Sequence, residues 1–497
     1  MSASASSQSQ ARPLLILTAL FLLSLPLVTT RIYASDEVQY FSYLRSLWFD
    51  RDVSFENEYQ HFYDSGVVRY PGFHETFLER QTATGRRETF ATMGSALLWS
   101  PFYAVADVVV RARRAMGDSS IAVDGYSQPY VSAVAYGSAV YGWLSLVLSM
   151  MIARRLFGDR VVTTGAGGIP LALVAAFAVW IGTPLFFYMY IAPPMSHACS
   201  AFATALFVLA WLHVRETWSL RGMIVLGALA ALLAMVREQD VFVAIGPAID
   251  WLVMFVRRMR AGDARGGKDS MRLVVNAGAG VVAFAIAYAP QLMAYMAING
   301  YLGPSRLVAR KMSWMSPHGL QVLGSPEHGL LFWTPLILLS LAGLACLVFV
   351  RGDDREDRDD RSKADGHSLI GICLILMVAT QVYVAGSVES WTVAGAFGQR
   401  RFVGLSAIFA IGLVAFLRAL PARERAPWPR RTAMAAVAVA VWWNLGLMAQ
   451  FGAGLMDRQR LELSRNAYHT FVTIPRRMPD LAYRYIFERR SFFKGQS

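Results

Sequence analysis

The sequence predicts an all-α protein that crosses a membrane many times. Hydrophobic residues make up 55% of the chain and charged residues only 16%, whereas a soluble protein has about 25% charged residues. The apolar residues also gather in runs that are long enough to span a bilayer as helices. The three cysteines lie inside these runs, so the sequence indicates neither a disulfide framework nor a cysteine metal site.

About eleven membrane helices are expected, within a range of ten to thirteen. The first apolar run follows Arg12 as in a signal peptide, but no small-x-small cleavage pattern comes after it, which favours a retained span. Residues 1–13 are then a disordered cytoplasmic N-terminus, and 14–450 form the membrane domain. The runs cover residues 14–30, 127–152, 167–187, 196–213, 221–236, 241–256, 272–298, 331–350, 368–386, 402–418 and 431–450.

Basic residues set the expected orientation. Arginines and lysines gather after the second, sixth, eighth and tenth runs, and in the turn between the fourth and fifth. All five loops fall on one side, which the positive-inside rule makes cytoplasmic. This distribution accounts for the net charge of +13 without a nucleic-acid-binding stripe. Membrane lipids are therefore expected as partners, and nucleic acids are not.

The opposite, extracytoplasmic side carries the longest loop. Residues 31–126 form this first extracytoplasmic loop, and 451–497 form a small C-terminal tail on the same side. Apolar and aromatic residues in 37–49 have the spacing of a helix that lies in the membrane interface. A second interfacial or re-entrant helix is expected at 89–110, because a glycine and a proline interrupt that apolar stretch.

An acidic pair, Asp36 and Glu37, opens the long loop directly after the first span. One interpretation is a solvated helix N-terminus, with Ser35 or Asp36 as N-cap and Glu37 in the first turn. The other is functional, because a carboxylate partly removed from water has a raised pKa and is a better general base. Asp36 and Glu37 are therefore candidate catalytic residues.

Several cationic residues on the same side are candidates for binding a phosphate. Arg400 and Arg401 follow a glycine-containing loop, and tandem arginines can hold an anionic oxygen through paired hydrogen bonds. Anchoring to lipid phosphates is the alternative, but a basic pair on this side opposes the usual charge bias. Arg237 and Lys311 complete the set, although an ion pair with a neighbouring acid would explain Arg237 without a function.

Four further residues are candidate substrate contacts. His197 opens a helix after two prolines and a serine, where an electropositive helix end suits anions. Trp391 and Gln399 precede the tandem arginines, and His328 lies in a loop whose prolines and glycines turn chemistry explains. A structural role remains open for each histidine. No tight metal-ligand spacing is present, so no cofactor is assigned, although the acidic pair keeps Mg²⁺ or Mn²⁺ open.

These features together resemble the GT-C superfamily, whose members are polytopic glycosyltransferases that use polyprenyl-phosphate-linked sugars. The chain looks most like the bacterial relatives of dolichyl-phosphate-mannose protein mannosyltransferases and of lipid A aminoarabinose transferases. The resemblance rests on the acidic pair with its adjoining helix, and on four stretches: GSALLWSPF at 94–102, PPMSHA at 193–198, GSPEHGLLFWTP at 324–335 and FGQRRF at 397–402. There is no Walker loop, GxSxG elbow, HExxH motif or dinucleotide fingerprint.

The resemblance implies a hexosyl or pentosyl transferase of the bacterial cytoplasmic (inner) membrane that acts in cell-envelope glycosylation. Its donor would be a polyprenyl-phosphate sugar, and its acceptor a hydroxyl of an unidentified lipid, glycan or protein on the extracytoplasmic side. By resemblance, Asp36 is the base and Arg400 or Arg401 holds the phosphate. One sugar phosphate would separate them by about 6–12 Å, and displacement would invert the anomeric carbon. A transporter or flippase-like binder of a lipid-linked or phosphorylated sugar is the rival class.

Overall fold

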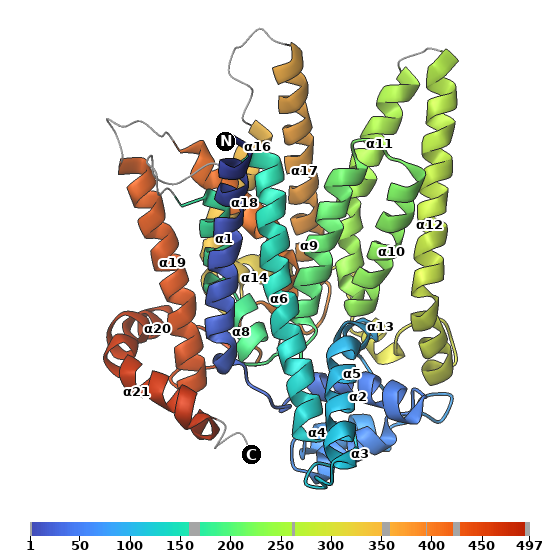
Figure 1. The fold of residues 1–497 in the computed structure, drawn as a ribbon, viewed down its shortest axis with the longest axis vertical. Coiled ribbons are helices and arrows are strands. Elements are labelled where there is room, and N and C mark those ends of the chain that lie inside the picture. Colours follow the sequence, from blue (N-terminus) through green and yellow to red (C-terminus); the bar gives the residue numbers. More distant parts are fainter. Residues whose placement is uncertain are drawn as a thin grey trace.

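The computed structural model describes residues 2–158, 169–260, 264–349, 358–393, 395–420 and 428–492. The part of the chain that it describes is helical and contains no β-strands. Most of the long helices run along the vertical axis of Figure 1, and shorter helices gather at one end. The first and the last described helices begin toward opposite ends of the bundle (Figure 1).

Seven helical stretches among the described residues are long and apolar enough to cross a membrane. The chain is therefore an all-helical membrane protein. The seven are α6 (Gln128–Phe157), α9 (His197–Val214), η4 (Glu238–Ala244) with α11 (Ile245–Arg260), Asp269–Asn299 within α12 (Ala264–Asn299), Gly366–Gly386 within α17 (Arg358–Gly386), η5 (Arg400–Leu405) with α18 (Ser406–Ala419), and α19 (Trp428–Ala453).

Four shorter apolar helices occupy the other predicted runs. Each of the eleven runs thus contains a helix, while the number that cross a membrane stays a prediction. The shorter stretches are Arg12–Leu27, made of the later part of α1 (Ser2–Ser24) and η1 (Leu25–Leu27), then α7 (Leu171–Gly182), α10 (Leu220–Val236) and α16 (Leu336–Phe349).

Two predicted runs are broken where a threonine precedes a proline. The run at 167–187 is divided into α7 and α8 (Leu185–Tyr190), because Thr183 is extended before Pro184. The run at 331–350 is divided in the same way before α16. Proline disfavours helical backbone in the residue before it, so each run becomes two helices instead of the single helix that was predicted.

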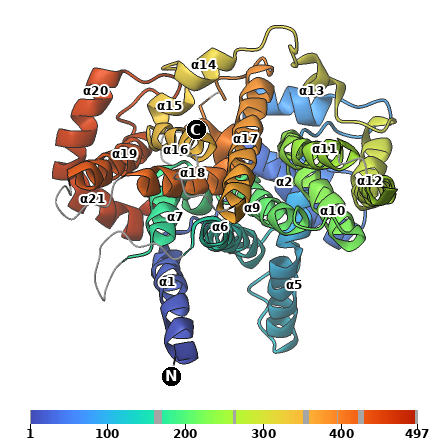
Figure 2. The ribbon, with the colours of Figure 1, turned by 90° about the horizontal axis from the view of Figure 1, so that it is seen from above.

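Residues 31–126, predicted to be the first extracytoplasmic loop, are folded into helices that lie at one end of the bundle, and α5 projects outward when the molecule is turned (Figures 1 and 2). The helices expected near 37–49 and 89–110 are both present, and their place in a membrane interface stays a prediction. The loop contains α2 (Ser35–Arg45), η2 (Ser46–Asp50), α3 (Glu56–Asp64), α4 (Pro71–Phe73), η3 (His74–Glu79) and α5 (Gly94–Ala115).

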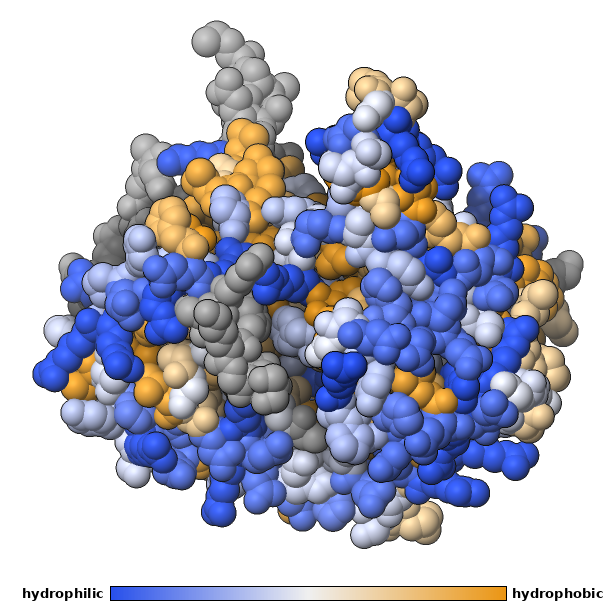
Figure 3. All heavy atoms as spheres, turned by 90° about the horizontal axis from the view of Figure 1, so that it is seen from below, coloured by the Kyte–Doolittle hydropathy of each residue, from blue (hydrophilic) through white to orange (hydrophobic). Residues whose placement is uncertain are grey.

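The C-terminal tail lies at the same end as the first loop (Figure 1). Seen from below, this end is mostly hydrophilic, with separate hydrophobic patches (Figure 3). The two segments that were predicted to share one side of the membrane therefore share one end of the molecule. The tail consists of α20 (Leu463–Tyr468), η6 (His469–Thr473), α21 (Ile474–Phe487) and η7 (Arg489–Phe492). The connection from α12 to α16 contains three short helices, α13 (Arg306–Arg310), α14 (Gly319–Gly324) and α15 (Leu330–Trp333).

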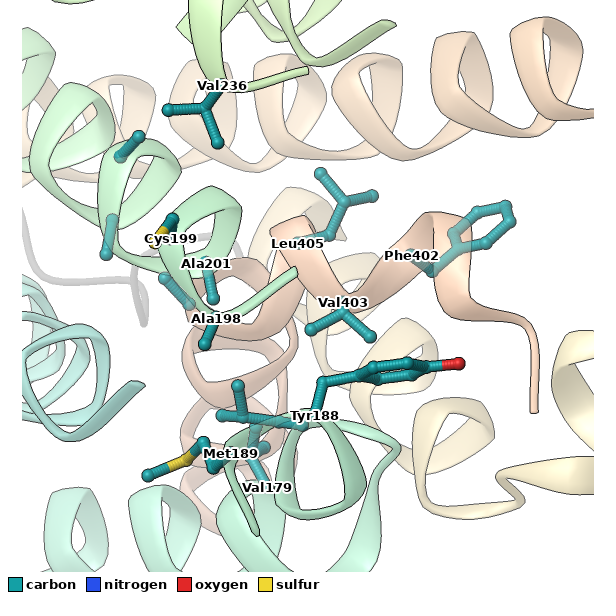
Figure 4. Packing of buried hydrophobic residues seen from close by; sticks show 14 of the residues in the cluster. Val179, Tyr188, Met189, Ala198, Cys199, Ala201, Val236, Phe402, Val403 and Leu405 are labelled. Atoms are coloured by element: carbon teal, nitrogen blue, oxygen red, sulfur yellow. The ribbon is translucent and has the colours of Figure 1, made fainter. Parts of the chain in front are cut away.

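Close helix packing holds η5, the short element that carries the tandem arginines, in the core. Val403 and Leu405 of η5 are buried, and η5 packs against α9. In Figure 4, Val403 lies beside the ring of Tyr188, a residue of α8. Gly404 permits the approach of η5 to α9, because a Cβ there would lie 2.5 Å from the Ser200 hydroxyl oxygen. Burial of η5 therefore fixes the position of the arginines at its start.

Candidate functional site

The acidic pair lies in the first turn of α2, and its two carboxylates have different partners. The N-cap is Ala34, so the expectation that Ser35 or Asp36 is the N-cap is wrong. Alanine has no side-chain acceptor, and Glu37 Oε2 instead accepts the backbone N–H groups of Tyr33 at 2.8 Å and Ala34 at 3.2 Å. Burial raises the pKa of Glu37 to about 8. The structure thus gives Glu37 the role of a helix cap.

Asp36 forms an ion pair with Arg400, which lies far from it in the sequence. Arg400 Nη1 donates to Asp36 Oδ2 at 2.7 Å, and the two residues are 364 positions apart. Both side chains are partly buried, with 39% of Asp36 and 23% of Arg400 exposed. The expected separation of about 6–12 Å is therefore wrong. The two opposite charges face the same space and contact each other directly.

A second pair, Arg237 and His197, contacts the backbone of Arg400. Arg237 Nη1 donates to His197 Nδ1 at 2.7 Å, and also approaches the backbone oxygen of Arg400 at 3.5 Å. A guanidinium can only donate, so Nδ1 is the acceptor and the buried His197 is neutral, with its proton on Nε2. The His197 ring lies 4.2 Å from the ring of Tyr188. The structure therefore brings three of the predicted residues together with Asp36.

Arg401 points away from this group and holds a loop. Its guanidinium donates to the backbone oxygen of Ser390 at 2.9 Å and to the Ser390 hydroxyl at 3.3 Å. Its own backbone oxygen accepts hydrogen bonds from Gln381 at 2.9 Å and Gln239 at 3.3 Å. Of the tandem arginines, Arg400 is the one that meets the acidic pair.

Three predicted substrate contacts, Gln399, His328 and Trp391, take part in hydrogen bonds that hold the loop before η5. Gln399 is buried and donates to the backbone oxygens of His328 at 3.2 Å and Trp391 at 3.1 Å. His328 Nε2 lies 2.8 Å from the backbone oxygen of Ala396, and its ring stacks on Trp333 with centroids 4.5 Å apart. These contacts position the backbone before Arg400, and direct contact with a substrate stays a prediction.

Lys311 contacts the loop of residues 31–126 through Phe90. Its ammonium group is above the ring of Phe90, 5.5 Å from the ring centroid, and its backbone oxygen accepts the N–H of Glu389 at 2.7 Å. The side chain is exposed. These contacts of Lys311 are with Phe90 and Glu389, and neither is with Asp36 or Glu37.

A cavity of about 740 Å³ adjoins the ion pair. Asp36, Arg400, Tyr33 and Arg458 supply polar groups to its wall, and most of the remaining wall is apolar. The volume is within the usual range for ligand sites. A wall with charged groups and a long apolar part fits a molecule that has an anionic head and a hydrocarbon chain. The apolar residues include Phe186, Phe187, Ile191, Leu445, Met448 and Leu481.

Two residues of this region were missed in the sequence. Tyr40 lies one helical turn after Asp36, where the spacing places both on one face of α2. Burial raises the pKa of Tyr40, while the charges of Arg237 and Arg400 act in the opposite direction. Arg458 of the tail lines the cavity, with its guanidinium 4.5 Å from the ring centroid of Phe451. The helical spacing could have indicated Tyr40, but no sequence pattern indicates Arg458.

Metal ligands are not gathered in the described part of the chain: it contains no group of three or more His, Cys, Asp or Glu residues that could hold an ion. Comparison of the sequence and structure with protein-family models, characterised proteins and solved structures finds no match.

Proposed function

We propose that the protein is a GT-C-like membrane glycosyltransferase. It moves a hexosyl or pentosyl group from a polyprenyl-phosphate donor to an acceptor hydroxyl, with inversion, on the extracytoplasmic side of a bacterial inner membrane. The observation that carries this proposal is the Asp36–Arg400 pair beside a largely apolar cavity. The eleven helical runs and the helices of the first loop agree with the resemblance seen in the sequence.

The pair offers the two groups that this reaction needs. A polyprenyl phosphate leaves as an anion, so its departure requires stabilisation of negative charge, which the Arg400 guanidinium supplies. An acceptor hydroxyl is a poor nucleophile and requires a base, which the Asp36 carboxylate supplies. The acceptor oxygen bonds to the anomeric carbon, the carbon–oxygen bond to the phosphate breaks, and the hydroxyl proton moves to Asp36. Polyprenyl phosphate and the glycosylated acceptor are the products.

Arg237 acts on this reaction through Arg400. It contacts the Arg400 backbone oxygen, and its bond to the neutral His197 fixes the direction of its guanidinium. A second positive charge so close to Arg400 increases the attraction for a phosphate. We therefore assign Arg237 and His197 to positioning, and Arg400 to direct contact with the phosphate.

Sugar transfer by the purified protein in lipid nanodiscs tests the proposal. The donors are polyprenyl phosphates that carry radiolabelled hexoses or pentoses, and the acceptor is an extract of envelope lipids and glycans. Asp36→Asn keeps the size of the side chain and removes the base, so transfer should fall by about 10²–10⁴ while donor binding remains. Asp64→Asn, at an exposed position in the same loop, is the control and should leave transfer unchanged.

The outcomes separate the two function classes. Unchanged transfer by Asp36→Asn would contradict the assignment of the base. Wild-type protein that binds the lipid-linked sugar, transfers none of it and moves it across the bilayer would instead identify a transporter. Measuring donor binding and transfer on the same nanodisc preparation makes this distinction.

A further inference from the structure

One face of the C-terminal helix α21 forms part of the cavity wall. Met478, Leu481, Ala482, Tyr485 and Ile486 all line the cavity. Their spacing of three, one, three and one residues places them on a single helical face. The tail therefore supplies one part of the cavity wall, and α8 and α19 supply others.

Side chains at the end of α21 and the start of η7 donate hydrogen bonds to backbone carbonyls of η1 and of the residue after it. Arg489 donates to the backbone oxygens of Val28 and Pro26, both at 2.7 Å. Tyr485, on the cavity face, donates to the backbone oxygen of Leu27 at 3.0 Å. Carbonyls at the end of a helix lack helical partners, so these side chains satisfy acceptors that would otherwise need water. We call these contacts of Tyr485 and Arg489 the clasp.

The start of α21 is held by separate contacts. Ile474 is fully buried. In η6, which precedes it, the backbone oxygen of Thr470 accepts the Trp442 indole N–H at 3.2 Å, and the Thr470 hydroxyl accepts a hydrogen bond from Gln450 at 2.8 Å. Both partners lie on α19. The helix is thus anchored to α19 at its start and to the first span by the clasp at its end.

We propose that α21 is the outer wall of a binding site for the hydrocarbon chain of a lipid phosphate, and that the clasp closes this wall over the chain. The chain lies between the apolar face of α21 and the apolar residues of α8 and α19, and its phosphate lies at Arg400. This inference rests on the lipid-phosphate donor of the proposed function. It adds that the tail, which holds neither the proposed base nor the phosphate-binding arginine, determines recognition of the chain.

The apolar character of the wall favours a chain over a soluble sugar phosphate. Met478, Leu481 and Ile486 offer the chain no hydrogen-bonding group, and neither do Leu445 and Met448 of α19 on the cavity wall. A hydrocarbon chain packs against these side chains without burying an unpaired polar group. A soluble sugar phosphate would leave this part of the cavity without a matching partner.

Binding measurements on two matched variants test the wall. Leu481→Trp enlarges a buried side chain of the cavity face. Tyr483→Trp introduces the same side chain at an exposed position of the same helix. The probes are a fluorescent long-chain polyprenyl phosphate, farnesyl phosphate and glucose 1-phosphate, each with protein in nanodiscs. Leu481→Trp should weaken binding of the long-chain probe at least tenfold, and Tyr483→Trp should leave it unchanged.

A variant of the clasp keeps the test independent of cavity packing. Arg489→Gln removes the charged donor without filling the cavity, and should raise the dissociation rate of the long-chain probe several-fold. Normal long-chain binding and dissociation in both Leu481→Trp and Arg489→Gln would overturn the inference, as would equally tight binding of glucose 1-phosphate by the wild type. These results do not depend on sugar transfer. A protein that binds the long chain through α21 but transfers no sugar would disprove only the proposed enzyme activity.

Discussion

Replacing Glu37 by glutamine should remove a component of the pH dependence of stability. Glu37 is fully buried at the start of α2, and burial raises its pKa from 4.5 to about 8. The folded protein therefore binds this proton more tightly than the unfolded chain. The resulting stabilisation is fully present below pH 4.5, and is lost progressively as the pH rises through 8. Over that whole range the loss corresponds to about 4–5 kcal/mol.

The assay is thermal unfolding in nanodiscs at a series of pH values from 5 to 8.5. The apparent Tm of the wild type should fall across this range, and the fall should be smaller in Glu37→Gln. Glutamine retains a carbonyl that can accept the two backbone N–H groups, so the cap remains while the titration disappears. Glu58 titrates in the same range, because burial raises its pKa to about 7. The difference between the two curves, in which Glu58 cancels, is therefore the measured quantity.

Glu75→Gln, at an exposed position of the first loop, is the control and should keep the wild-type slope. Infrared spectroscopy provides an independent measurement, since the wild type should show a protonated carboxyl band that titrates near pH 8 and is missing from Glu37→Gln. Equal pH slopes for wild type and Glu37→Gln would refute the reasoning, because a buried neutral glutamic acid requires a difference.

Two further predictions concern helix packing and the tandem arginines. Gly343→Ala should lower the apparent Tm, because the added Cβ would lie 1.8 Å from the backbone oxygen of Gly412 in α18, and such overpacking costs about 1–3 kcal/mol. The control, Gly278→Ala, should not lower the Tm, since no atom lies within 4 Å of its Cβ. Equal Tm values for the two variants would contradict this account. Arg400→Ala should weaken binding of polyprenyl phosphate about tenfold or more in a nanodisc titration. Arg401→Ala should weaken it less, because the Arg401 guanidinium contacts Ser390. A larger loss of binding in Arg401→Ala than in Arg400→Ala would argue against Arg400 as the phosphate ligand.

The sequence was sufficient to predict the helices, because long apolar runs between charged loops have few other folded forms in a membrane. It was less informative about where the runs break. Thr183 precedes Pro184 within an apolar run, and its extended backbone ends α7 before the run ends. Hydrophobicity summed over a window does not register this local conflict between proline and the preceding residue.

The site was predictable in its parts but not in its contacts. Asp36 and Arg400 could each be singled out by charge and position, yet 364 residues separate them, and only the packing of η5 shows that they touch. The sequence could not distinguish a base from a cap at Glu37. A capping box usually begins with a side chain that accepts a hydrogen bond, and here Ala34 occupies that position. Arg458 reaches the cavity through the fold of the tail, which no local pattern encodes.

The ion pair also orders the steps of the proposed reaction. A partly buried guanidinium without a counter-charge is unfavourable, and Asp36 offsets that cost in the free protein. While Asp36 Oδ2 is bound to Arg400, however, that oxygen is occupied and does not face an acceptor hydroxyl. We propose that an arriving phosphate competes for the same guanidinium and so releases Asp36. The base thus becomes available when the donor is in place, which favours transfer to an acceptor that arrives after the donor.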